Sequence, residues 1–478
     1  MKRTRGQSDI VIPKEVTEEA QRWLRENKDL VIQQKSYGSP RISSEIPDCS
    51  MPMTFDHHNY CSISCLYCFA YCFKSNNPAY KGKKVPLKSV NIDKMISAMQ
   101  GNPKDTRGRL MYTHFYHRKF LLHWGGLADP FCNFERKNRE GYKLITALGE
   151  MNYPTLFSFK GNDIFSKDYV QLFEKYADQG NFAFQVSIVT NSDELARQVE
   201  IGAPTTTKRI EAIRMLSDMG YWTILRLRPF IMGVTDIGLD ELLHRALDAG
   251  IKGVSTEWFA LDCRMNEGMK KRFAWMSEVM GTKDLQKYYS ALSPSTRGGY
   301  MRLNRKVKEM YVRQIYTFCA DHNLVCGISD PDFKELNTSG SCCGMPDKYE
   351  KNHGLENWTR NQLTYHLKEA RRLYHKTGEQ QLLRFDEVYG DESYFDDPPL
   401  THDHVSEIGL PLAIRYVRTY RMILRKHWNN LRSPANPRNY FDGKLMPETV
   451  DVEGNLLFRY TPMEYEKDWT TEGIDLTR

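Results

Sequence analysis

The chain has 478 residues, of which 40% are hydrophobic and 12% aromatic, and a formal net charge of +7. This composition suffices for a packed core and excludes a wholly disordered chain, while the length predicts a large domain with appendages or two to three domains. No run approaches the ~18 apolar residues of a membrane span, and the basic start lacks an apolar secretory segment. We therefore expect a cytoplasmic protein, not bound to a membrane, whose mild positive charge permits DNA or RNA as a partner.

The predicted elements begin with a leader, residues 1–50, that contains one helix at about Thr17–Asn27. Helical patterns follow, at Thr207–Met219 and at Leu239–Leu247, and they alternate with short apolar runs about 30 residues apart. These runs predict strands at Phe120–Trp124, Thr155–Phe159, Phe182–Ile188, Thr223–Leu227 and Ile251–Glu257. Such alternation predicts parallel βα units, in an α/β barrel or a doubly wound sheet, with the chemistry at the carboxyl ends of the strands.

The alternation of predicted strands and helices ends near Gly344. We therefore assign residues 51–344 to the α/β domain and 345–478 to a basic, mostly helical accessory region. Helices are predicted at Thr359–Lys376 and at about Pro411–Arg432. A β-hairpin is predicted over residues 444–460, around Glu453-Gly454-Asn455.

The motif that carries chemistry is Cys61, Cys65 and Cys68, with the spacing C-x3-C-x2-C. Eleven unevenly placed cysteines are too sparse for a disulfide scaffold in so long a chain. Three thiolates on one loop can hold three irons of a [4Fe–4S] cluster and leave the fourth iron open to a small molecule. The alternative is a zinc site, with Cys72, His57 or His58 as the fourth ligand.

The segments NYCSISCLYCFAYCF and HWGGLADP resemble the radical S-adenosylmethionine (SAM) superfamily. The resemblance implies a partial barrel of about six βα units in which Cys61, Cys65 and Cys68 ligate the cluster and Tyr67 is the aromatic residue before the last cysteine. It implies that Gly125 and Gly126 bring the main chain close to SAM, although two glycines could equally make a tight turn. It further implies reductive SAM cleavage to a 5′-deoxyadenosyl radical and a reductant such as flavodoxin or ferredoxin.

A closer resemblance, over roughly residues 55–260, is to the spore photoproduct lyase branch. It is carried by FSFKGNDIF, by FQVSIVTNSDELARQVEIGAPTTTKRI and by the P-x-x-x-G-x-T-D turn. It implies that Lys160 and Ser187 contact the carboxylate and ribose of SAM, and that Arg209 and Asp236 shape helix packing and a turn.

One departure concerns the hydrogen donor of that branch, a cysteine just before the Asp of the second-strand motif. Here Ala128 precedes Asp129, and Cys132 follows it. Thymine-dimer reversal is therefore not implied. Cys132 remains a candidate hydrogen-atom donor, with an inert thiol as the alternative.

Three late cysteines, Cys326, Cys342 and Cys343, lie after a predicted strand and in a Gly/Ser loop. They could bind a second Fe–S cluster or another metal, form a redox pair, or remain ordinary thiols. Cys72 is interpreted as a buried or spare thiol, with a cluster ligand as the alternative. The remaining cysteines are interpreted as packing residues, since a free cysteine behaves as a small hydrophobe; they are Cys49, Cys263 and Cys319.

A stripe of arginines at helical spacing, with Tyr416, Tyr420 and Trp428 between them, suits contact with phosphates and stacked bases, although such a run is often only a solvated face. The stripe comprises Arg415, Arg418, Arg421 and Arg425.

We therefore predict a radical SAM enzyme acting on a nucleic acid or nucleotide. The alternative is radical modification of a peptide or small metabolite, with a second metal site at the late cysteines. From another class, a non-catalytic Fe–S or zinc protein that binds nucleic acid would not need Gly125, Gly126, Lys160 and Ser187.

Overall fold

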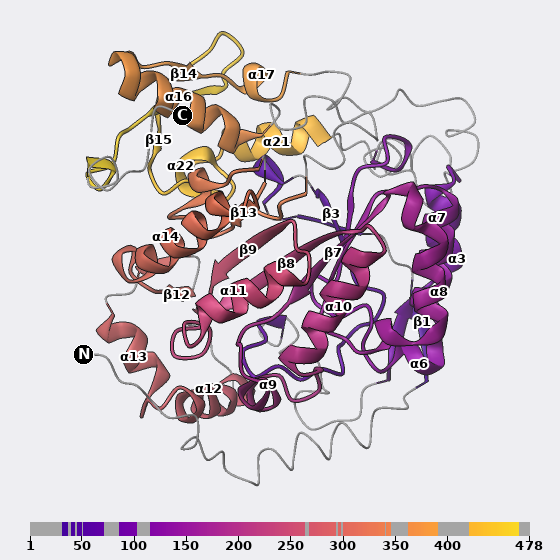
Figure 1. Cartoon of the computed structure of the whole chain (residues 1–478). Coiled ribbons are helices and arrows are strands. Elements are labelled where there is room, and N and C mark those ends of the chain that lie inside the picture. The colour runs from indigo at the N-terminus through magenta and orange to yellow at the C-terminus, as the bar shows by residue number, and fades with distance from the viewer. Residues whose placement is uncertain are drawn as a thin grey trace. The chain divides into compact units, whose positions relative to one another are not determined.

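The computed structural model is shown in Figure 1. It describes residues 31–36, 40–43, 45–49, 51–70, 86–102, 115–262, 267–292, 295–297, 300–339, 341–345, 362–390 and 420–467. Several sequence predictions fall outside these residues: the helix at Thr17–Asn27, Cys72, Cys263, Arg415, Tyr416 and Arg418. The chain divides into two compact units. Unit 1 comprises Met1–Gly38, Phe55–Ile92 and His123–Leu324; unit 2 comprises Ser39–Thr54, Asp93–Leu122 and Val325–Arg478.

Unit 1 is built on a mostly parallel sheet, which confirms the mixed α/β class. Its neighbouring strands are β9 (Gly253–Trp258), β8 (Trp222–Phe230), β7 (Phe182–Ser187), β6 (Thr155–Phe159) and β5 (Leu122–Trp124). The parallel register pairs Thr155 with Phe182 and Ile224 with Gly253. Every residue of β6 and β7 is buried, as expected for strands of a parallel sheet whose two faces are both covered.

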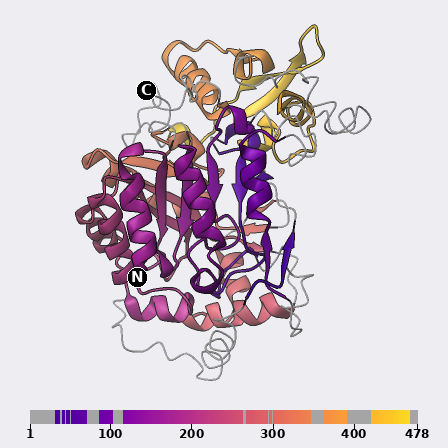
Figure 2. The ribbon, with the colours of Figure 1, turned by 90° about the vertical axis from the view of Figure 1, so that its right-hand side faces the viewer.

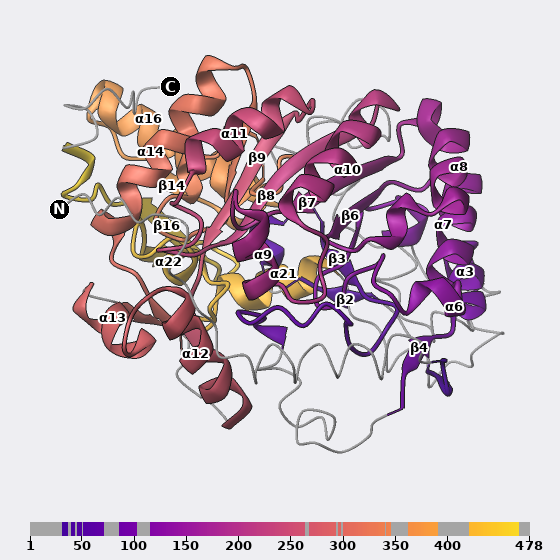
Figure 3. The same ribbon diagram turned by 60° about the horizontal axis from the view of Figure 1, so that its bottom comes forward.

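Helices follow the parallel strands at the predicted places (Figures 1 and 3). The helix α10 (Thr206–Asp218) packs against β7 and β8, and α14 (Arg305–Asp321) packs against β9. The predicted helix at Leu239–Leu247 is α11 (Leu239–Asp248), which begins after Gly238 and buries Leu239, Leu242, Leu243 and Ala246. Side-chain caps mark two starts, since Ser192 accepts from Leu195 N at α9 (Asp193–Val199) and Thr205 accepts from Lys208 N at α10.

The other elements of unit 1 surround this sheet, with helices across one face (Figure 2). They are β1 (Gln34–Ser36) paired in parallel with β4 (Lys88–Val90), α6 (Glu135–Asn138), α7 (Glu140–Glu150), η3 (Asp163–Phe165), α8 (Lys167–Tyr176), η4 (Ala177–Gln179), α12 (Glu267–Val279), α13 (Leu285–Ala291), and a small sheet of β10 (Leu261–Asp262), β12 (Tyr300–Arg302) and β11 (Ser295–Arg297). Aromatic side chains fill the core between strands and helices. The rings of Phe157 and Phe184 stack at 5.3 Å, and Phe184 meets Tyr221 edge-on at 5.1 Å.

Unit 2 combines short helices with two small groups of strands. In one group β2 (Arg41–Ile42) pairs antiparallel with β3 (Met53–Phe55). The predicted hairpin is confirmed as β15 (Leu445–Val450) and β16 (Leu456–Tyr460), with β14 (Leu382–Leu383) on the other edge of β16. The remaining elements are η1 (Ile46–Asp48), α3 (Ile92–Met99), which starts at the unit boundary, β13 (Val325–Ile328), η5 (Lys334–Leu336), α16 (Leu363–Thr377), α17 (Phe385–Val388), α21 (Tyr420–Trp428) and α22 (Pro437–Tyr440). None of the helices in the described ranges has the length and apolar character needed to cross a membrane.

Candidate functional site

The three cysteines of the C-x3-C-x2-C motif lie on the loop that follows β3, and none of the three forms a disulfide. The loop begins at Asp56, whose carboxylate Oδ1 accepts hydrogen bonds from the main-chain nitrogens of Leu127 (2.8 Å) and Ala128 (2.7 Å). Asp56 therefore joins the start of the cysteine loop to the turn after β5, which contains the two adjacent glycines.

Main-chain contacts hold the middle of the cysteine loop against the connection between α9 and α10. Leu66 N donates to Val199 O at 2.9 Å, and Gly202 N donates to Ile63 O at 2.8 Å. A side chain at Gly202 would come within 2.8 Å of Ile63 O, so the close approach requires glycine. Arg272 adds a guanidinium, which donates to Cys65 O at 2.7 Å. The cysteine loop thus has a defined position set mainly by its backbone.

A buried carboxylate, Glu200, lies directly under this loop and was missed as a functional residue in the sequence. Arg209 pairs with it at 2.5 Å, and both side chains are almost fully buried. The hydroxyl of Tyr67 donates to Glu200, and burial together with the Glu200 charge raises the pKa of Tyr67. Their order in the chain was visible in the motif E-x-x-A-P-x-x-x-x-R, in which Arg209 was expected only to shape helix packing.

Lys160 brings a positive charge to the same place. Its ammonium lies 3.8 Å from Glu200 Oε1 and 5.7 Å from the ring centre of Tyr67. Burial raises the pKa of the Cys65 thiol, while the charge of Lys160 acts to lower it. Asp129 fixes the backbone here, because its Oδ2 accepts from Lys160 N at 2.5 Å and Gly161 N at 3.0 Å.

The remaining predicted SAM-contact residues also lie in unit 1. Gly125 has a φ of +106° and a Cβ there would lie 2.0 Å from Ser158 O, so the position requires glycine. Gly126 continues this turn. Ser187 ends β7, where its hydroxyl accepts from Arg226 at 3.3 Å and its carbonyl accepts from Arg209 at 2.7 Å. Asp236 caps a turn through Gly233 N at 2.6 Å, as the resemblance implied.

Cys132 lies beside the first cysteine of the motif. Asn133 N donates to Ser62 Oγ at 3.1 Å, which fastens the two neighbouring segments together. A hydrogen bond between the side chains of Cys132 and Cys61, followed by burial, raises the pKa of the Cys61 thiol. The Cys132 side chain is 1% exposed.

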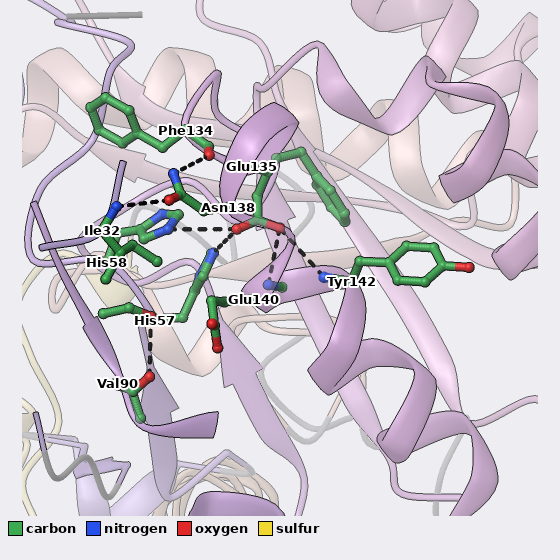
Figure 4. Close-up of polar contacts among 12 residues, drawn as sticks. Ile32, His57, His58, Val90, Phe134, Glu135, Asn138, Glu140 and Tyr142 are labelled. Carbon is green, nitrogen blue, oxygen red and sulfur yellow. Dashed lines mark hydrogen bonds and ion pairs between the residues drawn. The ribbon is translucent and has the colours of Figure 1, made fainter. Parts of the chain in front are cut away.

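The two histidines before the motif belong to a buried network around Glu135 (Figure 4). Nε2 of His57 lies 2.8 Å from Glu135 Oε1, and Nε2 of His58 lies 3.5 Å from the same oxygen. Tyr169 and Gly141 N donate to Oε2 at 2.8 and 2.9 Å. Burial acts to raise the pKa of Glu135, but the two histidines and these hydrogen bonds outweigh it and lower the pKa to about 2.

The ligand atoms of His57, His58 and Glu135 lie within 4.8 Å of one another, as in a metal site. The indole of Trp124, however, donates to His57 Nδ1 at 3.1 Å, so the ring proton of a neutral His57 is on Nε2 and points at Glu135. A metal on Nε2 would need that proton on Nδ1 instead. The geometry therefore favours a hydrogen-bonded network that holds the start of the cysteine loop in place. The histidine side chains contact Glu135 and do not complete a zinc site with the cysteines.

The two described arginines of the stripe form ion pairs within unit 2. On α21, Arg421 pairs with Asp386 at 2.7 Å, and Arg425 pairs with Glu453 at 3.3 Å. Tyr420 and Trp428 are each 2% exposed, so the expectation that these two rings stack on bases is wrong. They pack against apolar rings instead, because the helix uses this face for the core of unit 2.

The late cysteines are also in unit 2. Cys326 lies within β13 and not at its end, whereas Cys342 and Cys343 lie in residues 341–345. None of the three forms a disulfide.

Comparison with known proteins gives distant similarities. No family model matches the chain. Two uncharacterized proteins, Rv2578c of Mycobacterium tuberculosis and Mb2609c of Mycobacterium bovis, are each 24% identical over 220 residues. These alignments cover 44% of this chain and 61% of each relative, so the chain spans about three fifths of the length of the curated relatives it matches.

Among solved structures, spore photoproduct lyase complexed with dinucleoside spore photoproduct has a TM-score of 0.45 and 16% identity, over 65% of this chain and 84% of the lyase chain. Streptococcus suis SuiB bound to S-adenosylmethionine has a TM-score of 0.35 and 12% identity, over 59% of this chain and 51% of SuiB. The chain is similar in fold to these two proteins. Similarity of this degree concerns the fold alone.

Proposed function

We propose that the chain is a radical SAM enzyme in which Cys61, Cys65 and Cys68 bind a [4Fe–4S] cluster. The observation that carries the proposal is a three-thiol loop held in place by its main chain beside Lys160 and the Glu200–Arg209 pair. A merely structural metal loop would not need a lysine ammonium and a glycine turn next to it.

The cysteine spacing C-x3-C-x2-C supports a cluster, because three thiolates on one loop can bind three irons of a [4Fe–4S] cluster and leave the fourth iron open. The histidines that a zinc site would need as a fourth ligand lie beside Glu135 instead, since the ligand atoms of His57, His58 and Glu135 are within 4.8 Å of one another.

The chemistry would come from the cluster together with SAM, which supply reductive cleavage of SAM and a 5′-deoxyadenosyl radical that removes a hydrogen atom from the substrate. This chain's residues bind and orient. The Lys160 ammonium, which lies near Glu200, would pair with the carboxylate of SAM, and the turn at Gly125 and Gly126 would offer main-chain groups to its amino group. The Ser187 hydroxyl, which accepts a hydrogen bond from Arg226, would contact the ribose. A flavodoxin or ferredoxin would be the electron donor.

The substrate of the proposed reaction is a nucleic acid or nucleotide in the first candidate, which the resemblance to the lyase branch supports. A peptide or small metabolite is the second candidate. The acidic partners of Arg421 and Arg425 favour the second, because paired guanidinium groups are less available to phosphates.

The proposal is tested on anaerobically reconstituted protein with SAM and dithionite. We expect broad absorbance near ~400 nm, characteristic of a [4Fe–4S] centre, and release of 5′-deoxyadenosine. Cys65→Ala should abolish the release, whereas Cys319→Ala, which removes another buried thiol, should not. Lys160→Met should weaken SAM binding about tenfold, a loss of ~1.4 kcal/mol. Zinc without iron at the motif would contradict the proposal.

The substrate class is tested by binding to single- and double-stranded oligonucleotides over a salt series. If α21 contacts phosphates, Arg421→Gln with Arg425→Gln should lower the salt slope by about two units, near one for each lost contact. Lys252→Gln, an exposed change in unit 1, is the control. An unchanged slope, or no binding at low salt, would favour the peptide or metabolite candidate.

A further inference from the structure

One face of the parallel sheet in unit 1 is polar. Its strands β6, β7, β8 and β9 lie side by side (Figure 1), and residues paired across neighbouring strands point to the same face. The register pairs Ser158 with Gln185, and it pairs Ser187 with Arg226 and Arg226 with Ser255. A parallel sheet packed on both faces is expected to be apolar on both. This polar face is therefore suited to a bound ligand.

Side-chain contacts confirm that these residues share the polar face. Ser158 donates to Gln185 Oε1 at 3.0 Å, and its hydroxyl lies 2.8 Å from Nε2 of His123 on β5. Arg226 Nη1 donates to Ser187 Oγ at 3.3 Å. The opposite face of the same strands belongs to the apolar core, and its buried side chains include Phe157, Phe159, Phe184, Val186, Leu225 and Leu227.

Arg228 continues the polar face toward the carboxyl end of β8. It follows Arg226 by two residues, which places it about 6.6 Å farther along the strand. The pairing of β8 with β9 shifts between Leu227 and Phe230, so Arg228 lies at an irregularity of the strand. Such irregularities are frequent beside active sites, where they redirect a side chain. Nη1 of Arg228 lies 3.9 Å from Oε2 of Glu257 on β9.

The polar face has more positive than negative charge. Within β5 to β9 its arginines and carboxylates are Arg226, Arg228 and Glu257. The Arg228 side chain is only 13% exposed, whereas that of Glu257 is 38% exposed. Their separation exceeds the roughly 2.7–2.9 Å of a charge-assisted hydrogen bond, so Glu257 compensates the Arg228 charge only in part. A largely buried guanidinium in this setting is suited to an anion.

We propose that Arg228 binds an oxyanion of the substrate, a carboxylate or a phosphate. The proposal rests on the proposed function, in which Ser187 would contact the ribose of SAM. Arg226 contacts Ser187, and Arg228 lies one step beyond Arg226, toward the strand ends where parallel sheets bind their ligands. A guanidinium holds a carboxylate or phosphate through two parallel hydrogen bonds. The substrate would thus be anchored by its charge next to the ribose of SAM.

The experiment uses the full chain, reconstituted anaerobically and saturated with SAM without a reductant. The carboxylate of SAM then occupies Lys160, so a second anion must bind elsewhere. Isothermal titration calorimetry measures the binding of acetate and of inorganic phosphate at constant ionic strength, with chloride as the replacing ion. At least one of the two anions should bind to the wild type. Binding of acetate alone would indicate a carboxylate on the substrate, and preference for phosphate would indicate a phosphate.

The variants of the Arg228–Glu257 pair should change this binding in opposite directions. Arg228→Gln should weaken it about tenfold, because a hydrogen bond to a charged group is lost. Glu257→Gln should tighten it, by up to about fivefold, because the neighbouring carboxylate no longer competes for the guanidinium. A misfolded protein cannot produce both changes. Arg228→Lys, which keeps the charge but not the planar fork, should lie between Arg228→Gln and the wild type.

The matched control is Arg214→Gln, which removes an exposed arginine of α10 and should bind the anion as the wild type does. Equal binding by the wild type and Arg228→Gln, or binding of neither anion, would overturn the proposal. Weaker binding in Glu257→Gln would overturn it as well. Failure of the proposed function would show separately, as reconstituted protein that does not bind SAM. The Arg228-dependent binding would then be measured without SAM in Lys160→Met, which lacks the other cation.

Discussion

The two cysteine groups are assembled in opposite ways. The group in unit 1 sits on a single short loop whose backbone is bonded to a neighbouring connection, so its spacing is written in consecutive residues. The late group in unit 2 takes Cys326 from β13 and Cys342 and Cys343 from residues 341–345, where Cys342 O lies close to Gly327 of that strand. The first depends on local geometry and the second on tertiary packing, so different substitutions should disable them.

The largest expected effect comes from removing the charge under the first group. Arg209→Met leaves Glu200 buried without its partner, which should lower the free energy of unfolding by about 3–5 kcal/mol. It should also cost the iron bound by Cys61, Cys65 and Cys68. Urea unfolding and iron content measure both, with the exposed Arg214→Met on the same helix as the control.

Iron content and stability that both stay unchanged in Arg209→Met would contradict this role of the Arg209–Glu200 pair.

Acid should also act on the support of the first group. The pKa of Glu135, ordinarily near 4.5, is lowered to about 2, so its charge stabilises the fold above pH ~4.5 and this stability is lost as the pH falls toward 2. The difference corresponds to roughly 3 kcal/mol. Glu135→Gln should flatten the acid side of the stability curve measured by urea unfolding at each pH. The exposed Glu150→Gln should leave the curve unchanged, and an unchanged curve in Glu135→Gln would contradict this role.

Overpacking β13 should act on unit 2 and spare the cysteine loop of unit 1. A methyl group at Gly327 would press on Cys342 O, so Gly327→Ala should lower the free energy of unfolding by about 1–3 kcal/mol while the iron bound by Cys61, Cys65 and Cys68 is kept. Gly443→Ala is the control, since its φ of +86° makes alanine strained but no atom lies within 4 Å of the new methyl. Loss of that iron in Gly327→Ala would show that the two cysteine groups are not independent.

The smallest effect should be spectroscopic. The Cys132 side chain is a hydrogen-bond partner of Cys61. Once Cys61 binds the cluster as a thiolate, it can only accept, and a thiol proton donated by Cys132 would stabilise the more negative, reduced cluster. Cys132→Ala should therefore move the reduction potential downward without loss of iron. Cys132→Ser, which can still donate, should restore most of the shift. If the reduction potential does not change in either variant, Cys132 is either a hydrogen-atom donor or an inert thiol. Deuterium from the solvent in the product would indicate the donor, and its absence the inert thiol.

The sequence predicted what is encoded locally. Buried apolar runs gave β6 and β7 within one residue, and the Gly250 stop gave the end of α11, because strand and helix periodicities differ within a few residues. The cysteine spacing located the first group for the same reason. The motif included Glu200, but the local sequence does not predict that its carboxylate is buried against the cysteine loop and paired with Arg209.

Tertiary packing supplied the rest. Residues 341–345 pack on β13 at the point where Gly327 leaves room for Cys342 O, and no short-range pattern contains that contact. The faces of α21 were misjudged for a related reason. The basic sequence of this helix suggests that Tyr420 and Trp428 are exposed. Both rings are instead buried in the core of unit 2, because burying their large apolar surface stabilises the fold.

The main-chain bonds of Leu66 and Gly202 have a consequence for maturation. Because they and Arg272 set the shape of the cysteine loop from protein groups alone, the conformational entropy of ordering that loop is lost when the chain folds, not when iron arrives. This differs from small zinc domains, whose chain stays unfolded until the metal binds. The apoprotein should therefore be a folded acceptor, ready for a preassembled cluster to be transferred into it.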